Sequence, residues 1–243
     1  MNGFWAVFKR ELKAYFSTPV AYVFLVIFLF FAGYLPFREG FFELRQADLN
    51  LFFQILPLLF IFMVPSTAMR LWAEERRTGS IELLLTLPIT VPQAVLGKFF
   101  AAWAFLAIAL VLTFPLPAAV FYLGEPDPGL IIAGYLASFL MAGGFLAIGS
   151  FFSALTKNQV VSFILSVAAC GILVYAGMPS TLEYLSDMLP DSVLSVIESL
   201  SIQIHYDSLR RGVIAAADAA YFLILIAAWI YASMFVVEER KAS

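Results

Sequence analysis

Long apolar runs separated by short polar stretches dominate the pattern of residues along this chain. A helix needs about 20 mostly apolar residues to cross the hydrocarbon layer of a bilayer. Six runs approach or exceed this length, and they occupy residues 20–37, 51–71, 99–123, 130–155, 160–178 and 213–237. The pattern predicts an all-α integral membrane fold with six transmembrane helices in one domain, residues 1–243.

The first 17 residues predict a helix that lies along the membrane surface. Six large apolar side chains fall on one broad helical stripe, namely Phe4, Trp5, Phe8, Leu12, Tyr15 and Phe16. Lys9, Arg10, Glu11 and Lys13 lie largely off this stripe, as in interfacial amphipathic helices. A secretory signal is the alternative, but no small-x-small cleavage site comes after these residues and the next apolar run is too long.

Residues 74–88, between the second and third runs, have a different character. Four charged side chains open the segment, and Gly79 supplies a flexible start to the amphipathic stretch after it. Ile81, Leu84 and Leu85 share one helical face of that stretch, and Pro88 ends the element. This helix is too short to span a bilayer. It must therefore lie at the membrane surface or be gripped by another protein.

The segment 180–212, between the fifth and sixth runs, is mixed in character. Apolar residues at helical spacing on both sides of Pro190 predict two short amphipathic helices. The sixth run carries Asp218 near its start as its one charged residue.

The distribution of basic residues predicts the orientation, because Lys and Arg near span ends are retained in the cytoplasm. With the N-terminus inside, ten basic residues lie on the inner side and four, Arg38, Arg45, Arg210 and Arg211, on the outer side. Both termini and residues 74–88 are therefore expected in the cytoplasm, and residues 180–212 outside.

Composition excludes several classes of function. Hydrophobic residues make up 63% of the chain, against roughly 45–50% in soluble domains. The net charge of −3 argues against nucleic acid as a partner. One cysteine, Cys170, and one histidine, His205, allow neither an internal disulfide nor a Cys/His metal cluster.

Enzymatic and ion-coupled mechanisms also lack their residues. The Gly97-Lys98 pair has Val91 where a phosphate-binding loop needs glycine and Phe99 where it needs Ser or Thr. No pair of carboxylates lines a span, and the spans are almost free of charge. We therefore expect no catalytic, cofactor or metal site in this chain, and an energy source outside it.

The charged segment resembles a known motif. Glu74 to Pro88 is similar to the coupling-helix segment of ABC-2 type transporter permeases, which joins the second and third spans. Four further stretches resemble the gliding-motility-associated (GldF-like) branch of that family: Pro65 to Arg70, Leu96 to Phe100, Asn158-Gln159 and His205 to Ile214.

The resemblance implies a permease subunit of an ATP-driven exporter in a bacterial inner membrane. Its partners would be two copies of an ABC ATPase, which would bind ATP and magnesium, a second or related permease, and an accessory protein outside the membrane. The alternative is a membrane component of an ATP-driven mechanical or regulatory complex that acts on an envelope partner and moves no substrate.

The resemblance also implies roles for individual residues, each with a plainer alternative. The coupling residues would be Glu74, Glu75, Arg76, Arg77, Gly79, Ile81, Glu82, Leu84 and Leu85. Their charges would pair with the ATPase or act as a solvated anchor, and their apolar face would plug into the ATPase or lie on lipid headgroups. Candidates for an outer gate are His205, Tyr206, Asp207 and Arg211, which would otherwise cap the sixth span at headgroup level. Asp218 would face the interface between permeases or water.

Overall fold

The computed structural model describes residues 3–39, 48–79, 89–212 and 216–239, all of them in helices, turns or short connections with no strand. The prediction of an all-α membrane fold is confirmed. The helices run in this order: α1 Gly3–Ser17, α2 Pro19–Arg38, α3 Asn50–Ala68, α4 Ala73–Thr78, α6 Val91–Val111, α7 Pro115–Leu123, α8 Pro128–Leu155, α9 Gln159–Tyr175, α10 Pro179–Ser186, α11 Asp191–Leu200, α12 Ile202–Arg210 and α13 Ala216–Glu239.

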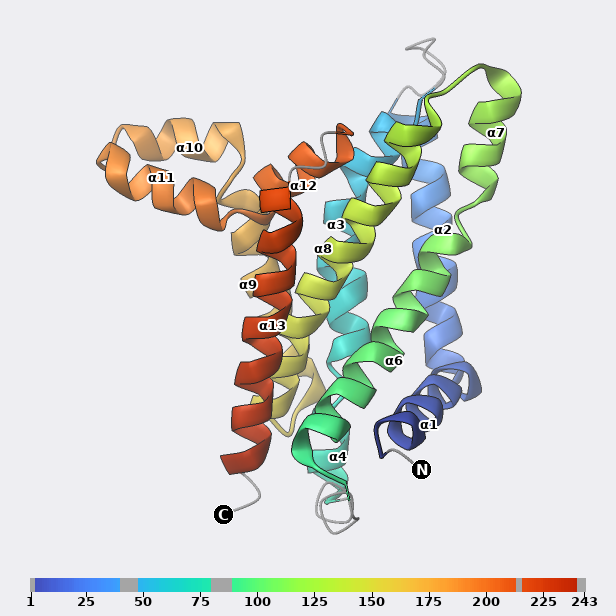
Figure 1. Cartoon of the computed structure of the whole chain (residues 1–243), viewed down its shortest axis with the longest axis vertical. Coiled ribbons are helices and arrows are strands. Elements are labelled where there is room, and N and C mark those ends of the chain that lie inside the picture. The colour runs from blue at the N-terminus through green and yellow to red at the C-terminus, as the bar shows by residue number, and fades with distance from the viewer. Residues whose placement is uncertain (1–2, 40–47, 80–88, 213–215, 240–243) are drawn as a thin grey trace.

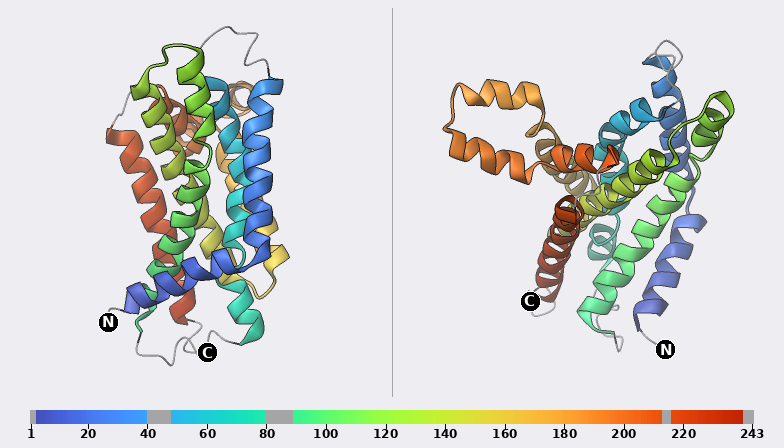
Figure 2. Two further views of the ribbon diagram at one scale, coloured as in Figure 1. Left: turned by 90° about the vertical axis from the view of Figure 1, so that its right-hand side faces the viewer. Right: turned by 45° about the horizontal axis from the view of Figure 1, so that its top comes forward.

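Within the described residues, five helical stretches are long and apolar enough to cross a membrane, or six if a bent pair is counted. The bent pair is α9 with α10, which meet at 75°. The long helices run side by side, while α1 lies across one end of the bundle (Figure 2). Both termini lie at that end, which we call the terminal end (Figure 1). The other end is called the opposite end.

Local chemistry explains where the helices begin. Thr90 and Gln93 form a capping box at the start of α6, in which the side chain of each residue bonds the backbone N–H of the other. Asp127 Oδ1 accepts a hydrogen bond of 2.7 Å from the Gly129 N–H at the start of α8. Asn158 Oδ1 accepts one of 2.9 Å from Val160 at the start of α9. The polar residues between the apolar runs therefore act as helix starts.

Helix α8 is the centre of the bundle and packs against α3, α6, α9, α12 and α13. Small residues make this packing possible. A Cβ atom on Gly134 would lie 2.4 Å from the Phe53 ring, and one on Gly149 would lie 2.5 Å from Ala68 Cβ. Neighbouring helices therefore approach α8 more closely than a larger side chain would allow.

Two segments differ from their predicted form. The third run is broken into α6 and α7 around Thr113 and Pro115, because proline removes a backbone donor and disrupts the preceding turn. Residues 180–212 contain three short helices instead of two, because Ser201 takes an extended conformation that ends α11 and starts α12. Helices α10 and α11 project sideways from the opposite end as a hairpin (Figure 1).

The close approach to α8 gives a matched test. Gly149→Ala places a methyl group against Ala68 and is expected to destabilise the protein by about 1–3 kcal/mol through overpacking. The methyl group of Gly171→Ala on α9 meets no atom within 4 Å. Because glycine is a poor residue in a helix interior, this substitution should stabilise the protein by about 0.5–1 kcal/mol. Thermal unfolding of both variants in one detergent measures the difference. Equal melting temperatures would contradict the packing argument.

Candidate functional site

The predicted coupling segment begins in helix α4, at the terminal end, and α4 is fixed to the end of α8. The Ser153 hydroxyl accepts hydrogen bonds from the backbone N–H groups of Trp72 and Ala73 at 3.0 and 3.1 Å, and donates to the Met69 carbonyl at 3.0 Å. One side chain on α8 therefore satisfies three backbone groups in the turn between α3 and α4. The fully buried Trp72 indole N–H donates to Ser150 on the same helix at 3.3 Å.

A buried lysine connects α4 to two further helices. The Lys98 side chain on α6 is only 2% exposed, and its ammonium has three acceptors. These are Glu75 Oε1 on α4 at 2.8 Å, Glu11 Oε1 on α1 at 3.3 Å and the Leu71 carbonyl at 3.0 Å. The ammonium also lies 5.1 Å from the Trp72 ring centroid. An ammonium has three N–H donors, so the hydrogen bonding of Lys98 is complete.

Arg10 completes a balanced group of charges. Its guanidinium bonds Glu11 at 2.6 Å and Glu75 at 3.4 Å. Two cations and two carboxylates therefore meet where α1, α4 and α6 converge, and we call these four residues, Arg10, Glu11, Glu75 and Lys98, the ionic junction. A charge removed from water needs such partners, because an unpaired one costs several kcal/mol.

Sequence and packing together bring α1 into position. A Cβ atom on Gly97 would lie 2.9 Å from Val7 and 3.2 Å from the Phe4 carbonyl oxygen. Glycine at this position lets α1 cross directly over α6, and the next residue is Lys98. Two turns further along α1, Tyr15 stacks on Phe105 with ring centroids 4.9 Å apart.

The charges of the junction shift the titration of Glu11. Burial alone would raise the pKa of this carboxyl, but the charges of Lys98 and Arg10 and their hydrogen bonds lower the pKa below its ordinary value of 4.5. Glu11 is thus stabilised as a carboxylate in the folded protein.

The other predicted coupling residues have separate positions. Glu74 pairs with Arg70 at 3.2 Å, and Arg76 donates to the Ala154 carbonyl at the end of α8. Arg77 is exposed, and Gly79 ends α4 with a φ of +73°, a conformation that favours glycine. The charged stretch is helical and Gly79 comes directly after it, while the rest of the helix predicted over residues 74–88 lies outside the described residues. The predicted residues Ile81, Glu82, Leu84 and Leu85 lie outside the described residues.

Sequence reasoning missed most of the junction. Lys98 entered the prediction only as one of the ten basic residues on the inner side and as the lysine of a rejected phosphate-binding loop, and Glu11 entered it as part of the polar side of the first helix. The available signal was a single lysine at the start of an apolar run, directly after glycine. A lone charge there suggests a partner on another element, since a lysine is rarely buried without one.

The predicted outer-gate residues lie around α12, near the opposite end. The Tyr206 hydroxyl is buried, donates to the Phe53 carbonyl at 2.8 Å and lies 3.1 Å from Ser138 Oγ. Burial raises the pKa of Tyr206, so its hydroxyl stays protonated and joins α12 to α3 and α8. This residue fixes α12 in place.

His205 faces a different helix. Its Nδ1 lies 2.6 Å from Asp218 Oδ1 on α13, and its Nε2 lies 3.1 Å from the Ser199 carbonyl oxygen at the end of α11. The ring also stacks on Tyr221 at 3.9 Å. Asp218, predicted to face an interface or water, is instead the partner of His205 and of the Ser208 hydroxyl. His205 thus ties the base of the hairpin to α13.

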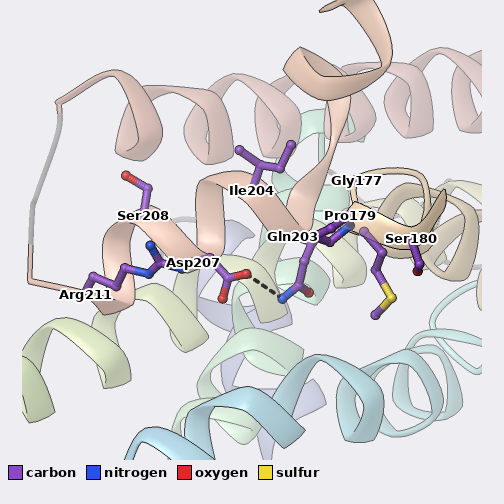
Figure 3. A pocket seen from close by; sticks show the side chains of 9 residues that line it. Gly177, Pro179, Ser180, Gln203, Ile204, Asp207, Ser208 and Arg211 are labelled. Atoms are coloured by element: carbon purple, nitrogen blue, oxygen red, sulfur yellow. Dashed lines mark hydrogen bonds between the residues drawn. The ribbon is translucent and has the colours of Figure 1, made fainter. Parts of the chain in front are cut away.

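Asp207 and Arg211 line an open pocket of about 660 Å³ between α12 and the bend that joins α9 to α10 (Figure 3). Asp207 accepts hydrogen bonds from Gln203 Nε2 at 3.0 Å and from Arg210 Nε. The structure therefore separates the four gate candidates into two residues that fix helices and two that face a pocket. Across the four described stretches of the chain, no group of three His, Cys, Asp or Glu side chains has the geometry to hold a metal ion.

These observations define a multi-pass α-helical membrane protein with a short charged helix bonded to the ends of several spans. A family model described as ABC-2 family transporter protein matches residues 39–236. The chain belongs to this family and is the membrane component of an ABC transporter, a transmembrane subunit that is not itself catalytic. Membership implies an ABC ATPase as partner. A comparison with curated proteins finds no match.

The ionic junction predicts a large effect from one substitution. Lys98→Met removes the shared cation and leaves two partly buried carboxylates facing each other, so we expect a loss of about 3–5 kcal/mol in stability. Adding Glu75→Gln should recover part of this loss. Lys13→Met, on the exposed side of α1, is the control and should change little. Thermal unfolding in detergent is the measurement, and a Lys98→Met protein as stable as the control would contradict the role of the junction.

The lowered pKa of Glu11 predicts that the stability of the folded protein depends on pH. Its pKa is lower in the folded than in the unfolded protein, so its contribution to stability is fully present above about 4.5, the ordinary value, and is lost as the pH falls through the folded pKa. Glu11→Gln should therefore be less stable than the parent protein at pH 7, and the gap should narrow as the pH falls below about 4.5. Unfolding curves between neutral and acid pH test this, and a constant gap would contradict it.

Proposed function

We propose that this chain is the permease subunit that couples a separate ABC ATPase to the membrane, with residues 74–88 as the element on which the ATPase acts. The observation that supports this most directly is the bonding of α4, the described start of that segment. It is joined to α1 and α6 through Lys98, to α8 through Ser153 and Arg76, and to α3 by a short turn.

A coupling element has to pass displacement on to the spans instead of moving alone. Ion pairs and hydrogen bonds in a water-poor site resist separation, because each broken pair leaves a charge without a partner. A force applied beyond Gly79 therefore acts on four elements together. A helix that only anchored the chain to lipid headgroups would need none of these bonds.

The proposal includes an orientation and a location. Positive residues near the span ends are more numerous on the side of the termini, which supports a cytoplasmic terminal end. The bacterial inner membrane is part of the proposal through the sequence resemblance. In this orientation α4 faces the compartment that contains ATP, with ATP and magnesium bound by the partner ATPase.

The membrane pathway is proposed to form between two permease copies and to serve export. A change at the terminal end would reach the opposite end through α8, which packs against helices at both ends of the bundle, α4 and α12 among them. The low charge of the spans fits apolar or amphipathic substrates better than ions. The gliding-motility branch, with its accessory protein, is part of the proposal through the sequence resemblance.

The test is recovery of the complex. We expect the protein extracted in mild detergent to co-purify with an ABC ATPase, identified by mass spectrometry. Leu84→Asp should abolish this association, because a charge on the apolar face cannot enter a hydrophobic groove without large cost. Leu200→Asp, an exposed leucine on α11, is the matched control and should retain the ATPase.

Two results would contradict the proposal. One is ATPase recovery with Leu84→Asp at the parental level. The other is a parental protein that is folded after extraction, as its melting curve shows, but that co-purifies with no ATPase. An unchanged melting temperature of Leu84→Asp shows that loss of the partner reflects docking and not misfolding.

A further inference from the structure

The pocket at the opposite end has the polar groups of a binding site. It lies between the α9–α10 bend, at Gly177 to Ser180, and one face of α12 (Figure 3). Its lining combines apolar side chains, such as Met178 and Ile204, with Gln203, Asp207 and Arg211. It is an open pocket of about 660 Å³.

One acceptor in this pocket has no partner. Gln203 Oε1 is buried from solvent and receives no hydrogen bond from any described residue. The amide orientation is fixed, because Gln203 Nε2 donates to Asp207 Oδ2 at 3.0 Å and a flip would place two acceptors together. Because this atom has almost no solvent-exposed surface, a ligand reaches it only if the pocket wall moves, and that ligand would then have to donate a hydrogen bond.

The adjacent Asp207 carboxylate favours a ligand whose hydrogen-bond donor carries a positive charge. Asp207 accepts from Gln203 and from Arg210, but a carboxylate has about four acceptor sites, so it can accept more. Gln203 Oε1 and the Asp207 carboxylate together suit a primary ammonium, which has several N–H donors and a positive charge. A quaternary ammonium has no N–H and would leave Gln203 unsatisfied.

The other side of the pocket suits an anion. Arg211 comes directly after the last turn of α12, four residues after Asp207, and is exposed; none of the ion pairs found among the described residues involves it. A guanidinium binds phosphate oxygens well, often through two parallel hydrogen bonds. The pocket thus has acceptors for an ammonium and a donor for a phosphate within about two turns of helix.

The position of the pocket in the fold narrows the chemical class of the ligand further. Helix α9 ends at Tyr175, two residues before Gly177 of the pocket wall, so the pocket is level with the ends of the spans, where lipid headgroups lie. Ile204 on the pocket wall is an exposed apolar side chain, suited to contact with an acyl chain. We propose that this pocket binds the headgroup of an aminophospholipid of the phosphoethanolamine type. The proposal does not depend on ATPase coupling.

The test uses the purified full-length chain and three lipids with identical acyl chains, phosphatidylethanolamine, phosphatidylcholine and phosphatidylglycerol. Native mass spectrometry measures the bound fraction of each. Loss of the ammonium contacts should weaken binding by about tenfold or more, as expected for hydrogen bonds to a charged group. Phosphatidylethanolamine should therefore be retained over the other two.

Two variants separate the parts of the site. Gln203→Met should remove the preference for phosphatidylethanolamine over phosphatidylcholine. Arg211→Gln should weaken binding of all three lipids, since all contain phosphate. Arg38→Gln, at the end of α2 and outside the pocket, is the control and should bind as the parent does. Melting temperatures confirm that each variant is folded.

A competition experiment shows whether the headgroup is recognised on a membrane lipid or also on a soluble molecule. Displacement of the lipid by soluble glycerophosphoethanolamine supports recognition of the headgroup from any source, and retention of the lipid supports a membrane lipid with its acyl chains. Equal binding of phosphatidylethanolamine and phosphatidylcholine by the parent, or a preference that survives Gln203→Met, would overturn the proposal.

Discussion

The terminal end of this protein depends on keeping one lysine charged while it is almost fully removed from water. A buried ammonium is tolerated only when its donors are satisfied and its charge is balanced. Lys98 meets both conditions with groups from α1, α4 and the α3–α4 turn, so these elements cannot separate without exposing an unpaired charge. The hydrophobic effect provides little force between helices inside a bilayer, which makes such specific polar contacts more important for their arrangement.

The junction and the packing around α8 act on the same set of helices. Lys98 holds α1 and α4 to α6, while Ser153 and Ser150 hold the α3–α4 turn to α8. Glycines at the crossing points then set how closely the helices approach, as Gly97 does for α1 and Gly149 for α3. Close approach brings short polar side chains within bonding distance of backbone groups. Small residues and polar contacts are therefore two parts of one arrangement.

The sequence predicts the helices well and their long-range partners poorly, for a physical reason. Apolar runs, prolines and capping residues act within a few positions, so span locations and helix starts can be read from them. The three acceptors of Lys98 are 23, 27 and 87 positions away, and Tyr206 bonds a carbonyl 153 positions away. No local pattern specifies such pairs. The break at Ser201 was missed because serine also occurs inside helices.

The two ends of the molecule differ in how firmly they are held, and this difference bears on how motion passes through it. At the terminal end, α4 is bonded to elements on several sides. At the opposite end, α10 and α11 pack mainly against each other and bury none of their residues. The base of their hairpin is held by one hydrogen bond from His205 and one from Tyr221. Segments with few buried contacts open at low cost in free energy. In the proposed function, a displacement that enters at the stiff end would pass through α8 and would become movement where the structure is least constrained. The hairpin and the pocket beside it are at that place, so the occupant of the pocket would be the first group outside the helical bundle to experience the change.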